Sequence, residues 1–221
     1  MSLPPGILAR GPWAMEQIVA TWDADHYDPP TAITDAADVE IQALADRGSP
    51  SHDGLAARLV DWSLQDDGRL SLQLQPVRWG LRLVDGDASS SMASLCIVRD
   101  SKGRWLAGRR AAWLSTWAGR WALGAGGAVD VGESPADTLV RELREEWAVA
   151  PARVRGEALV RLQHQMVMFV GQAWLAEGVD DELVMDKEHD AFAWWPADID
   201  AWPDEADAPL RHMARLLDDA G

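Results

Sequence analysis

The feature that most constrains this chain is the stretch of residues 127–149, GAVDVGESPADTLVRELREEWAV, which sets several acids and two arginines around a predicted helix. Ser134-Pro135 indicates where the helix begins. Ser accepts hydrogen bonds from the free amides of a first turn, and Pro lacks an N–H that would have no partner there. One apolar face is predicted by residues that recur at helical spacing: Ala136, Leu139, Val140, Leu143 and Trp147.

A different face of the same helix carries Glu142, Glu145 and Glu146, whose spacings of three and four residues make their carboxylates converge. The alternative is a solvated acidic face, which is the usual meaning of a charge run. Like charges within one turn repel by a few tenths of a kcal/mol per pair, and a bound cation removes that cost. Oxygen ligands without Cys or His favour Mg²⁺ or Mn²⁺ over zinc. The pattern therefore predicts a divalent metal site, in which Arg141 is placed to orient Glu145.

Four small residues, Gly124-Ala125-Gly126-Gly127, precede the helix. Glycine lets the backbone come close to a ligand and turn a carbonyl toward a cation. The residues Trp121-Ala122-Leu123 lead into this loop. We expect this loop to bring the backbone close to a bound cation.

Residues 127–149 resemble the signature box of the Nudix hydrolases, the MutT-like family, G-x5-E-x7-R-E-U-x-E-E-x-G-U with U aliphatic. Gly127, Glu133, Arg141-Glu142-Leu143 and Glu145-Glu146 match the box, and Ala148 replaces its last glycine. Residues 121–127 are similar to the Trp-x-Leu-Pro-x-Gly-Gly run of many members, with Gly124 in place of Pro. That exchange makes the loop more mobile and removes no ligand.

The resemblance covers roughly residues 90 to 220 and implies an α/β fold, the Nudix α/β/α sandwich with a mixed sheet. It implies that Glu142, Glu145 and Glu146 hold the metal together with the Gly126 carbonyl, and that Glu133 and Arg141 support the site. The implied activity is Mg²⁺-dependent hydrolysis of a diphosphate bond in a nucleoside diphosphate linked to another moiety. The alternatives are an isopentenyl-diphosphate isomerase-like enzyme and a non-catalytic nucleotide-binding regulator.

Other candidate site residues lie outside the box. Arg109 and Arg110 end a predicted strand near the glycine loop and are candidates for holding substrate phosphates, with a solvated strand end as the equal alternative. The acidic stretch 180–190 predicts a mobile loop, in which Glu182 or Glu188 is a candidate for the extra carboxylate that many Nudix enzymes carry, although a solvated loop is favoured. His164 stands alone and is interpreted as structural.

The composition of the chain limits the classes of partner that it can bind. The chain has 221 residues, 48% of them hydrophobic, which is enough for a sizeable core. A net charge of -16 argues against general nucleic-acid binding, which requires a basic surface. No apolar run reaches membrane-spanning length, no signal-peptide pattern is present, and Cys96 is the only cysteine. We expect a cytoplasmic protein whose partner is a small nucleotide-type diphosphate.

Residues 85–91, DGDASSS, predict a flexible joint between an appended N-terminal α+β region, 1–88, and a Nudix domain, 89–221. After the joint we expect strands at 93–98, 105–108, 158–162, 167–175 and 191–195, and a helix at 209–217. Before it we expect a helix from Thr34 or Asp35 to Gly48, a short helix marked by Leu55, Leu59 and Trp62, and strands from 70 and from 77 to 83. The N-terminal region is expected to cover the site or to mediate formation of a homodimer.

Overall fold

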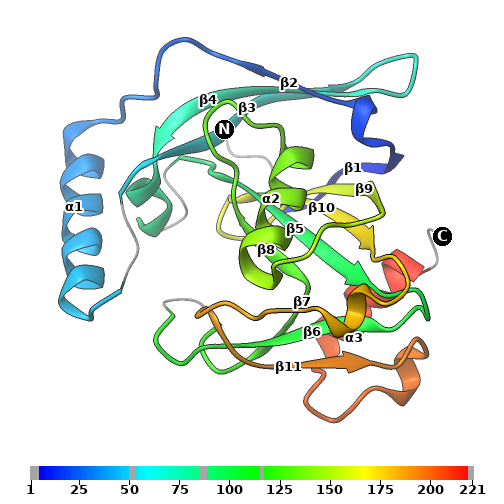
Figure 1. The fold of residues 1–221 in the computed structure, drawn as a ribbon. Helices are drawn as coiled ribbons and strands as arrows, with labels where there is room; N and C mark the ends of the chain where they lie inside the picture. Colours follow the sequence, from blue (N-terminus) through cyan, green and yellow to red (C-terminus); the bar gives the residue numbers. More distant parts are fainter. Residues whose placement is uncertain (1–4, 50–52, 85–88, 115–116, 219–221) are drawn as a thin grey trace.

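The computed structural model describes residues 5–49, 53–84, 89–114 and 117–218. Its largest element is an eight-stranded mixed sheet, in which β5 and β10 are parallel neighbours and the other pairs are antiparallel (Figure 1). The strands follow the spatial order β1 (Gly6–Trp13), β9 (Arg153–Arg161), β10 (Val167–Trp174), β5 (Met92–Arg99), β6 (Trp105–Arg110) and β11 (His189–Trp195). Two short strands complete it: β7 (Trp121–Leu123) pairs with β6, and β8 (Ala125–Ala128) with β5. The joint predicted at 85–91 lies partly outside the described residues, at 85–88.

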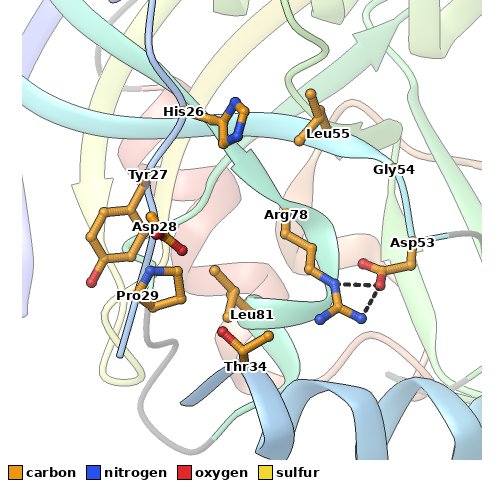
Figure 2. Close-up of a pocket in the computed structure, with 10 residues that line it drawn as sticks. All are labelled: His26, Tyr27, Asp28, Pro29, Thr34, Asp53, Gly54, Leu55, Arg78 and Leu81. Carbon is orange, nitrogen blue, oxygen red and sulfur yellow. Dashed lines mark hydrogen bonds and ion pairs between the residues drawn. The ribbon is translucent and has the colours of Figure 1, made fainter. Parts of the chain in front are cut away.

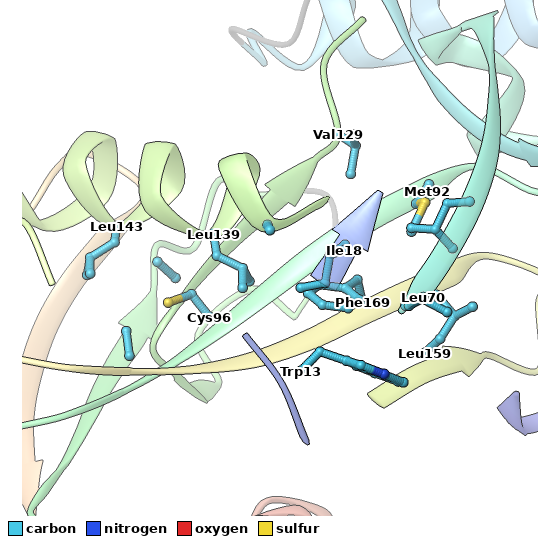
Figure 3. Close-up of a cluster of buried hydrophobic side chains, with 14 of the residues drawn as sticks. Trp13, Ile18, Leu70, Met92, Cys96, Val129, Leu139, Leu143, Leu159 and Phe169 are labelled. Carbon is cyan, nitrogen blue, oxygen red and sulfur yellow. The ribbon is translucent and has the colours of Figure 1, made fainter. Parts of the chain in front are cut away.

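Helices α2 (Pro135–Trp147) and α3 (Ala208–Asp218) cover opposite faces of the sheet. Successive residues of a strand point to opposite faces. Cys96 of β5 packs in the cluster that holds Leu139 of α2, whereas Ile97 packs in the cluster that holds Leu210 of α3. Figure 3 shows Leu139 and Leu143 near Cys96. The predicted α/β/α sandwich is therefore confirmed.

The predicted start of α2 is also confirmed. The Ser134 hydroxyl accepts a hydrogen bond from the Asp137 amide at 3.2 Å, and the Asp137 carboxylate accepts one from the Ser134 amide at 3.0 Å. This reciprocal cap satisfies two amides that the helix cannot pair internally. The apolar face is buried as expected, since Leu139, Leu143 and Trp147 are fully inaccessible to solvent.

A second sheet of three strands lies in the N-terminal region, in the order β2 (Ile18–Trp22), β4 (Leu70–Arg78) and β3 (Leu55–Leu64). Helix α1 (Thr31–Asp46) begins slightly before the predicted start and precedes β3 in the chain. Short 3-10 turns occur at η1 (Met15–Gln17), η2 (Trp79–Leu83), η3 (Val179–Asp181) and η4 (Ile199–Ala201). The region is thus α+β, as predicted, although strands β1 and β2 were not foreseen.

The short helix predicted from Leu55, Leu59 and Trp62 is wrong, because these residues belong to β3. The pairing of β3 with β4 shifts register between Leu59 and Asp61. Such a β-bulge adds one residue to the strand and changes the spacing of its inward-facing side chains from two to three. A spacing of three residues from Leu59 to Trp62, after one of four from Leu55 to Leu59, is close to one helical turn, which explains the error.

The second strand predicted at 77–83 is also wrong beyond Arg78, where β4 ends and η2 begins. The Asp53 carboxylate accepts hydrogen bonds from Arg78 Nε at 2.5 Å and from the Gly80 amide at 2.9 Å. The Asp53 side chain therefore takes the hydrogen bond of the Gly80 amide, which a longer strand would need for pairing with its neighbour. Pro76 is tolerated inside β4 because β2 pairs only with residues 70–74, so no neighbour there needs its missing N–H.

The N-terminal region shares a hydrophobic core with the rest of the chain. Ile18 and Leu70 pack in one cluster with Met92 and Phe169 (Figure 3). Strand β1 is itself a strand of the main sheet, where it pairs with β9. The division of the chain at residue 88 stays a prediction, and these contacts show what a cut there would expose.

Candidate active site

Arg141 is the centre of the hydrogen-bonding network around α2. Its Nε donates to both oxygens of Glu133, at 3.0 and 3.1 Å, and its Nη2 donates to the Ala128 carbonyl at 2.9 Å. Its Nη1 donates to Glu142 at 2.7 Å and to Glu145 at 3.2 Å. Burial lowers the pKa of Arg141, but the neighbouring carboxylates of Glu142 and Glu133 raise it by more. The guanidinium therefore stays charged and joins the helix to the strand before it.

Glu142 and Glu146 are buried, whereas the Glu145 side chain is 58% exposed. Burial raises the pKa of Glu142 to about 7, although Arg141 opposes the shift, and burial raises the pKa of Glu146 well above its ordinary value. The Glu146 Oε1 accepts a hydrogen bond from the Gly126 amide at 2.9 Å. When both are ionised, the Glu142 and Glu146 carboxylates repel each other, and a bound cation would remove that cost. The contact from Gly126 comes from its amide, and a metal contact by its carbonyl stays a prediction.

Gly127 forms a cradle for Glu142. A β-carbon at Gly127 would lie 2.6 Å from the Glu142 carboxyl carbon, closer than side chains can approach. The all-oxygen donor set and this close fit both suit a hard divalent ion such as Mg²⁺. The residues that would hold it are Glu142, Glu145 and Glu146.

The segment 184–189 brings further groups to the box. The Val184 amide donates to the Trp147 carbonyl at 3.0 Å, and the Asp186 amide donates to the Glu146 carbonyl at 2.9 Å. Burial raises the pKa of Glu188, whose charge acts in turn on Glu142 and Glu146. This part of the acidic stretch is attached to the end of α2 and is not the solvated loop that was favoured.

The two candidates for an extra acid therefore differ. Glu188 is partly buried beside the box, and its Oε2 lies 3.7 Å from Arg110 Nη2. Glu182 is exposed after η3, and no contact among the described residues joins it to the box acids. Of the two, Glu188 is the one that the fold places near Glu142 and Glu146.

His189 lies beside the box acids, although the sequence patterns single out only His164. Its side chain is 2% exposed, and its Nε2 lies 3.8 Å from Glu146 Oε2. Its Nδ1 lies 3.2 Å from Asp186 Oδ1. The only signal in the sequence is a histidine at the start of a strand that follows an acidic stretch, and that signal specifies no partner.

The predicted phosphate-binding arginines end β6 and face the start of β11, with Arg110 opposite His189 and Arg109 opposite Ala191. Arg109 pairs with Asp190 at 2.6 Å, and both side chains are more than two-fifths exposed. Exposed ion pairs contribute at most about 1 kcal/mol, so a phosphate can compete for Arg109. Binding of substrate by either arginine stays a prediction.

Among the described residues, no three Asp, Glu, His or Cys side chains already converge on one point. Arg141 Nη1 binds both Glu142, at 2.7 Å, and Glu145, at 3.2 Å, so the guanidinium occupies the space between these two carboxylates. Magnesium usually keeps several waters and takes one or two carboxylates together with substrate phosphates. The geometry therefore suits a metal ion that binds together with the substrate, and not one that is held by protein ligands alone.

The model of the NUDIX domain family matches residues 90–217, more than half of the chain. The chain belongs to the Nudix family. A comparison with curated proteins gives no match. The matched range begins just before β5 and contains the whole box.

Several solved structures are similar to this chain at low identity. The MutT protein from Methanosarcina mazei Go1 is 22% identical, with 59% of this chain and 94% of that chain covered and a TM-score of 0.45. An Ap4A hydrolase from C. elegans is 18% identical, with coverage of 58% and 94% and a TM-score of 0.44. A Nudix hydrolase from M. smegmatis, RenU, is 18% identical, with coverage of 73% and 97% and a TM-score of 0.44.

A cavity of about 340 Å³ lies in the N-terminal region, away from the Nudix box (Figure 2). His26, Tyr27 and Asp28 line one side of it, and Arg78 is ion-paired with Asp53 on the other. No box acid lines this cavity. Within the described part of the chain, no helix is long and apolar enough to cross a membrane.

Proposed function

We propose that this Nudix protein hydrolyses a diphosphate bond in a nucleoside diphosphate linked to another moiety, with Mg²⁺ or Mn²⁺ as cofactor. The observation that supports this most is the pair of buried carboxyl groups, Glu142 and Glu146, held against Gly126-Gly127. Bound divalent ions would neutralise charge that develops on the phosphate oxygens and make water a better nucleophile.

The chain's own residues would divide the remaining work. Glu142, Glu145 and Glu146 would bind the cation, and Glu133 would keep Arg141 in place through its two hydrogen bonds. Arg109 and Arg110 would bind phosphate oxygens at the mouth of the site. Glu188, or one of the box acids, would accept the proton of the attacking water. Cytoplasmic location is part of this proposal.

The isomerase alternative finds less support. It would need a reactive cysteine, and Cys96 is fully buried on β5. Burial raises the pKa of the Cys96 thiol, and the nearby Glu146 raises it further. A thiol in such surroundings is a packing residue and not a nucleophile.

The test is a panel of nucleoside triphosphates, nucleotide sugars and dinucleotides incubated with Mg²⁺, with the products resolved by chromatography. We expect cleavage of at least one linked nucleoside diphosphate, and loss of nearly all turnover in Glu146→Gln. Glu40→Gln, an exposed change on α1, is the matched control and should keep wild-type turnover. Equal turnover in Glu146→Gln would overturn the site assignment. Nucleotide binding without cleavage anywhere in the panel would favour the regulator.

A further inference from the structure

His189 is fixed in place on three sides. Its ring packs on the Trp147 ring, with centroids 4.7 Å apart, at the end of α2. On another side it meets Gly108 of β6, where a β-carbon would lie 2.9 Å from His189 Nε2. Its own strand, β11, pairs with β6. The imidazole therefore has little freedom to turn away from Glu146.

The hydrogen bonds of Asp186 determine which ring nitrogen carries a proton. Asp186 Oδ1 accepts from the Glu188 amide at 2.9 Å and lies 3.2 Å from His189 Nδ1. A carboxylate oxygen only accepts hydrogen bonds when ionised, so Nδ1 is the donor of this pair. The other nitrogen, Nε2, then carries a free lone pair and lies 3.8 Å from Glu146 Oε2, which is too far for a hydrogen bond.

This arrangement matches the surroundings of a histidine that binds a metal. Metal-binding histidines usually donate the other ring N–H to a carboxylate, which fixes the ring and makes the free nitrogen a better ligand. Two ligand atoms bound to one ion at about 2.0 to 2.2 Å lie about 2.8 to 3.1 Å apart at a right angle and about 3.3 to 3.6 Å apart at the tetrahedral angle. Nε2 and Oε2 are 3.8 Å apart, so a shift of a few tenths of an ångström would bring them to the tetrahedral separation. Imidazole suits transition metals, whereas Mg²⁺ prefers oxygen.

We propose that His189 Nε2 and Glu146 Oε2 form a mixed nitrogen and oxygen site, oriented by Asp186, that binds Mn²⁺ or Co²⁺ in preference to Mg²⁺. The inference rests on the proposed function in one respect, the role of Glu146 as a metal ligand. It adds a nitrogen ligand to a set that the box alone makes entirely of oxygen. Water or substrate oxygens would complete the coordination.

The first measurement uses the full-length wild-type protein and Co²⁺ alone. Binding of Co²⁺ next to His189 should give a strongly shifted, exchangeable imidazole N–H signal in the proton NMR spectrum, because Nδ1 keeps its proton. We expect this signal to be missing in His189→Gln and present in His164→Gln, a control in an exposed turn. Absence of the signal from Co²⁺-loaded wild-type protein would overturn the inference, whether or not any variant folds.

The second measurement compares Mn²⁺ and Mg²⁺ affinities by calorimetry. We expect His189→Gln to weaken Mn²⁺ binding at least tenfold and Mg²⁺ binding less than threefold. Asp186→Asn, which leaves both proposed ligands in place, should weaken Mn²⁺ binding by about ten- to a hundredfold. Equal Mn²⁺ affinity in wild type and His189→Gln would overturn the inference. Hydrolysis with Mg²⁺ is assayed on the same preparations, so failure of the proposed function is seen separately.

Discussion

Gly127 and Glu142 are packed so closely that a β-carbon on the glycine would lie 2.6 Å from the carboxyl carbon of the glutamate. Arg141 holds the same carboxylate from the other side, with Nη1 2.7 Å from Glu142 Oε1. The strand, the helix and the arginine thus fix one acid between them. Its position depends on the absence of a side chain at residue 127.

Gly127→Ala is therefore expected to displace Glu142 and to weaken Mg²⁺ binding at least tenfold, with a parallel loss of turnover. Calorimetry and the hydrolysis assay measure the two effects. Gly178→Ala is the control, because Gly178 has a φ of +86° but open space around it. That variant should lose stability while keeping its metal affinity. If Gly127→Ala behaves like the control, the cradle has no role in binding.

The raised pKa values of Glu142 and Glu146 predict how stability depends on pH. Glu142 has an ordinary pKa of 4.5 and a folded-state pKa of about 7. The folded protein therefore holds this proton more tightly than the unfolded chain, so the contribution to stability is full below pH 4.5 and is lost as the pH rises toward 7. Metal binding requires the ionised acids. We expect Mg²⁺ to raise the melting temperature more at pH 7.5 than at pH 5.5, and Glu146→Gln to lose most of that increase.

Ala148 ends α2 in the left-handed conformation, with φ 57° and ψ 24°. Glycine adopts this conformation without the steric cost that a methyl group brings. Because Ala148 is exposed, its methyl group loses no packing when removed. Ala148→Gly should leave stability unchanged or raise it by up to about 1 kcal/mol in urea unfolding, and keep activity within a few-fold. A large loss of activity would mean that the methyl group contacts the substrate.

The box was predictable because its signals are local. The cap at Ser134 and the spacing of the acids act within a few residues, so the sequence alone locates α2 and Glu142. The contact of His189 with Glu146 depends instead on the pairing of β11 with β6 and on a hydrogen bond from the Asp186 amide. Such contacts depend on pairing between strands that are far apart in the sequence, and the spacing of residues along the chain does not predict that pairing. Strand β3 was mispredicted for a local reason, because the β-bulge after Leu59 gives its apolar residues a spacing that is typical of a helix.

Gly124 stands where many family members carry Pro, and the structure shows why Pro does not fit here. Its φ is +68°, its amide donates to the Leu106 carbonyl at 2.9 Å, and its carbonyl accepts from Trp147 Nε1 at 3.1 Å. Pro fixes φ near −65° and has no N–H. Gly124→Pro should destabilise the protein by about 3 kcal/mol or more in urea unfolding. An unchanged unfolding midpoint would show that the loop adopts the family's usual path.

Removal of residues 1–88 tests whether the remaining chain can fold alone. The cut deletes β1, which covers the edge of β9. It removes the core residues that the N-terminal region contributes, among them Leu70. It also deletes Trp22, whose Nε1 donates to the Glu133 carbonyl at 3.1 Å. An uncovered strand edge and an open core favour aggregation. We therefore expect a chain beginning at Ser89 to lack a cooperative melting transition.

A single substitution in the N-terminal region, Trp22→Phe, tests its effect on substrate binding without removing the region from the fold. Trp22→Phe keeps most of the aromatic packing and removes only the hydrogen bond to Glu133, so it should fold and keep its Mg²⁺ affinity. We expect its apparent substrate affinity to fall by a few-fold, because the N-terminal region is expected to cover the site and this hydrogen bond joins it to the box. Trp62→Phe, on β3 at the other edge of the same three-stranded sheet, is the matched control and should keep wild-type substrate affinity. A folded Trp22→Phe protein with wild-type substrate affinity would show that this hydrogen bond has no role in substrate binding.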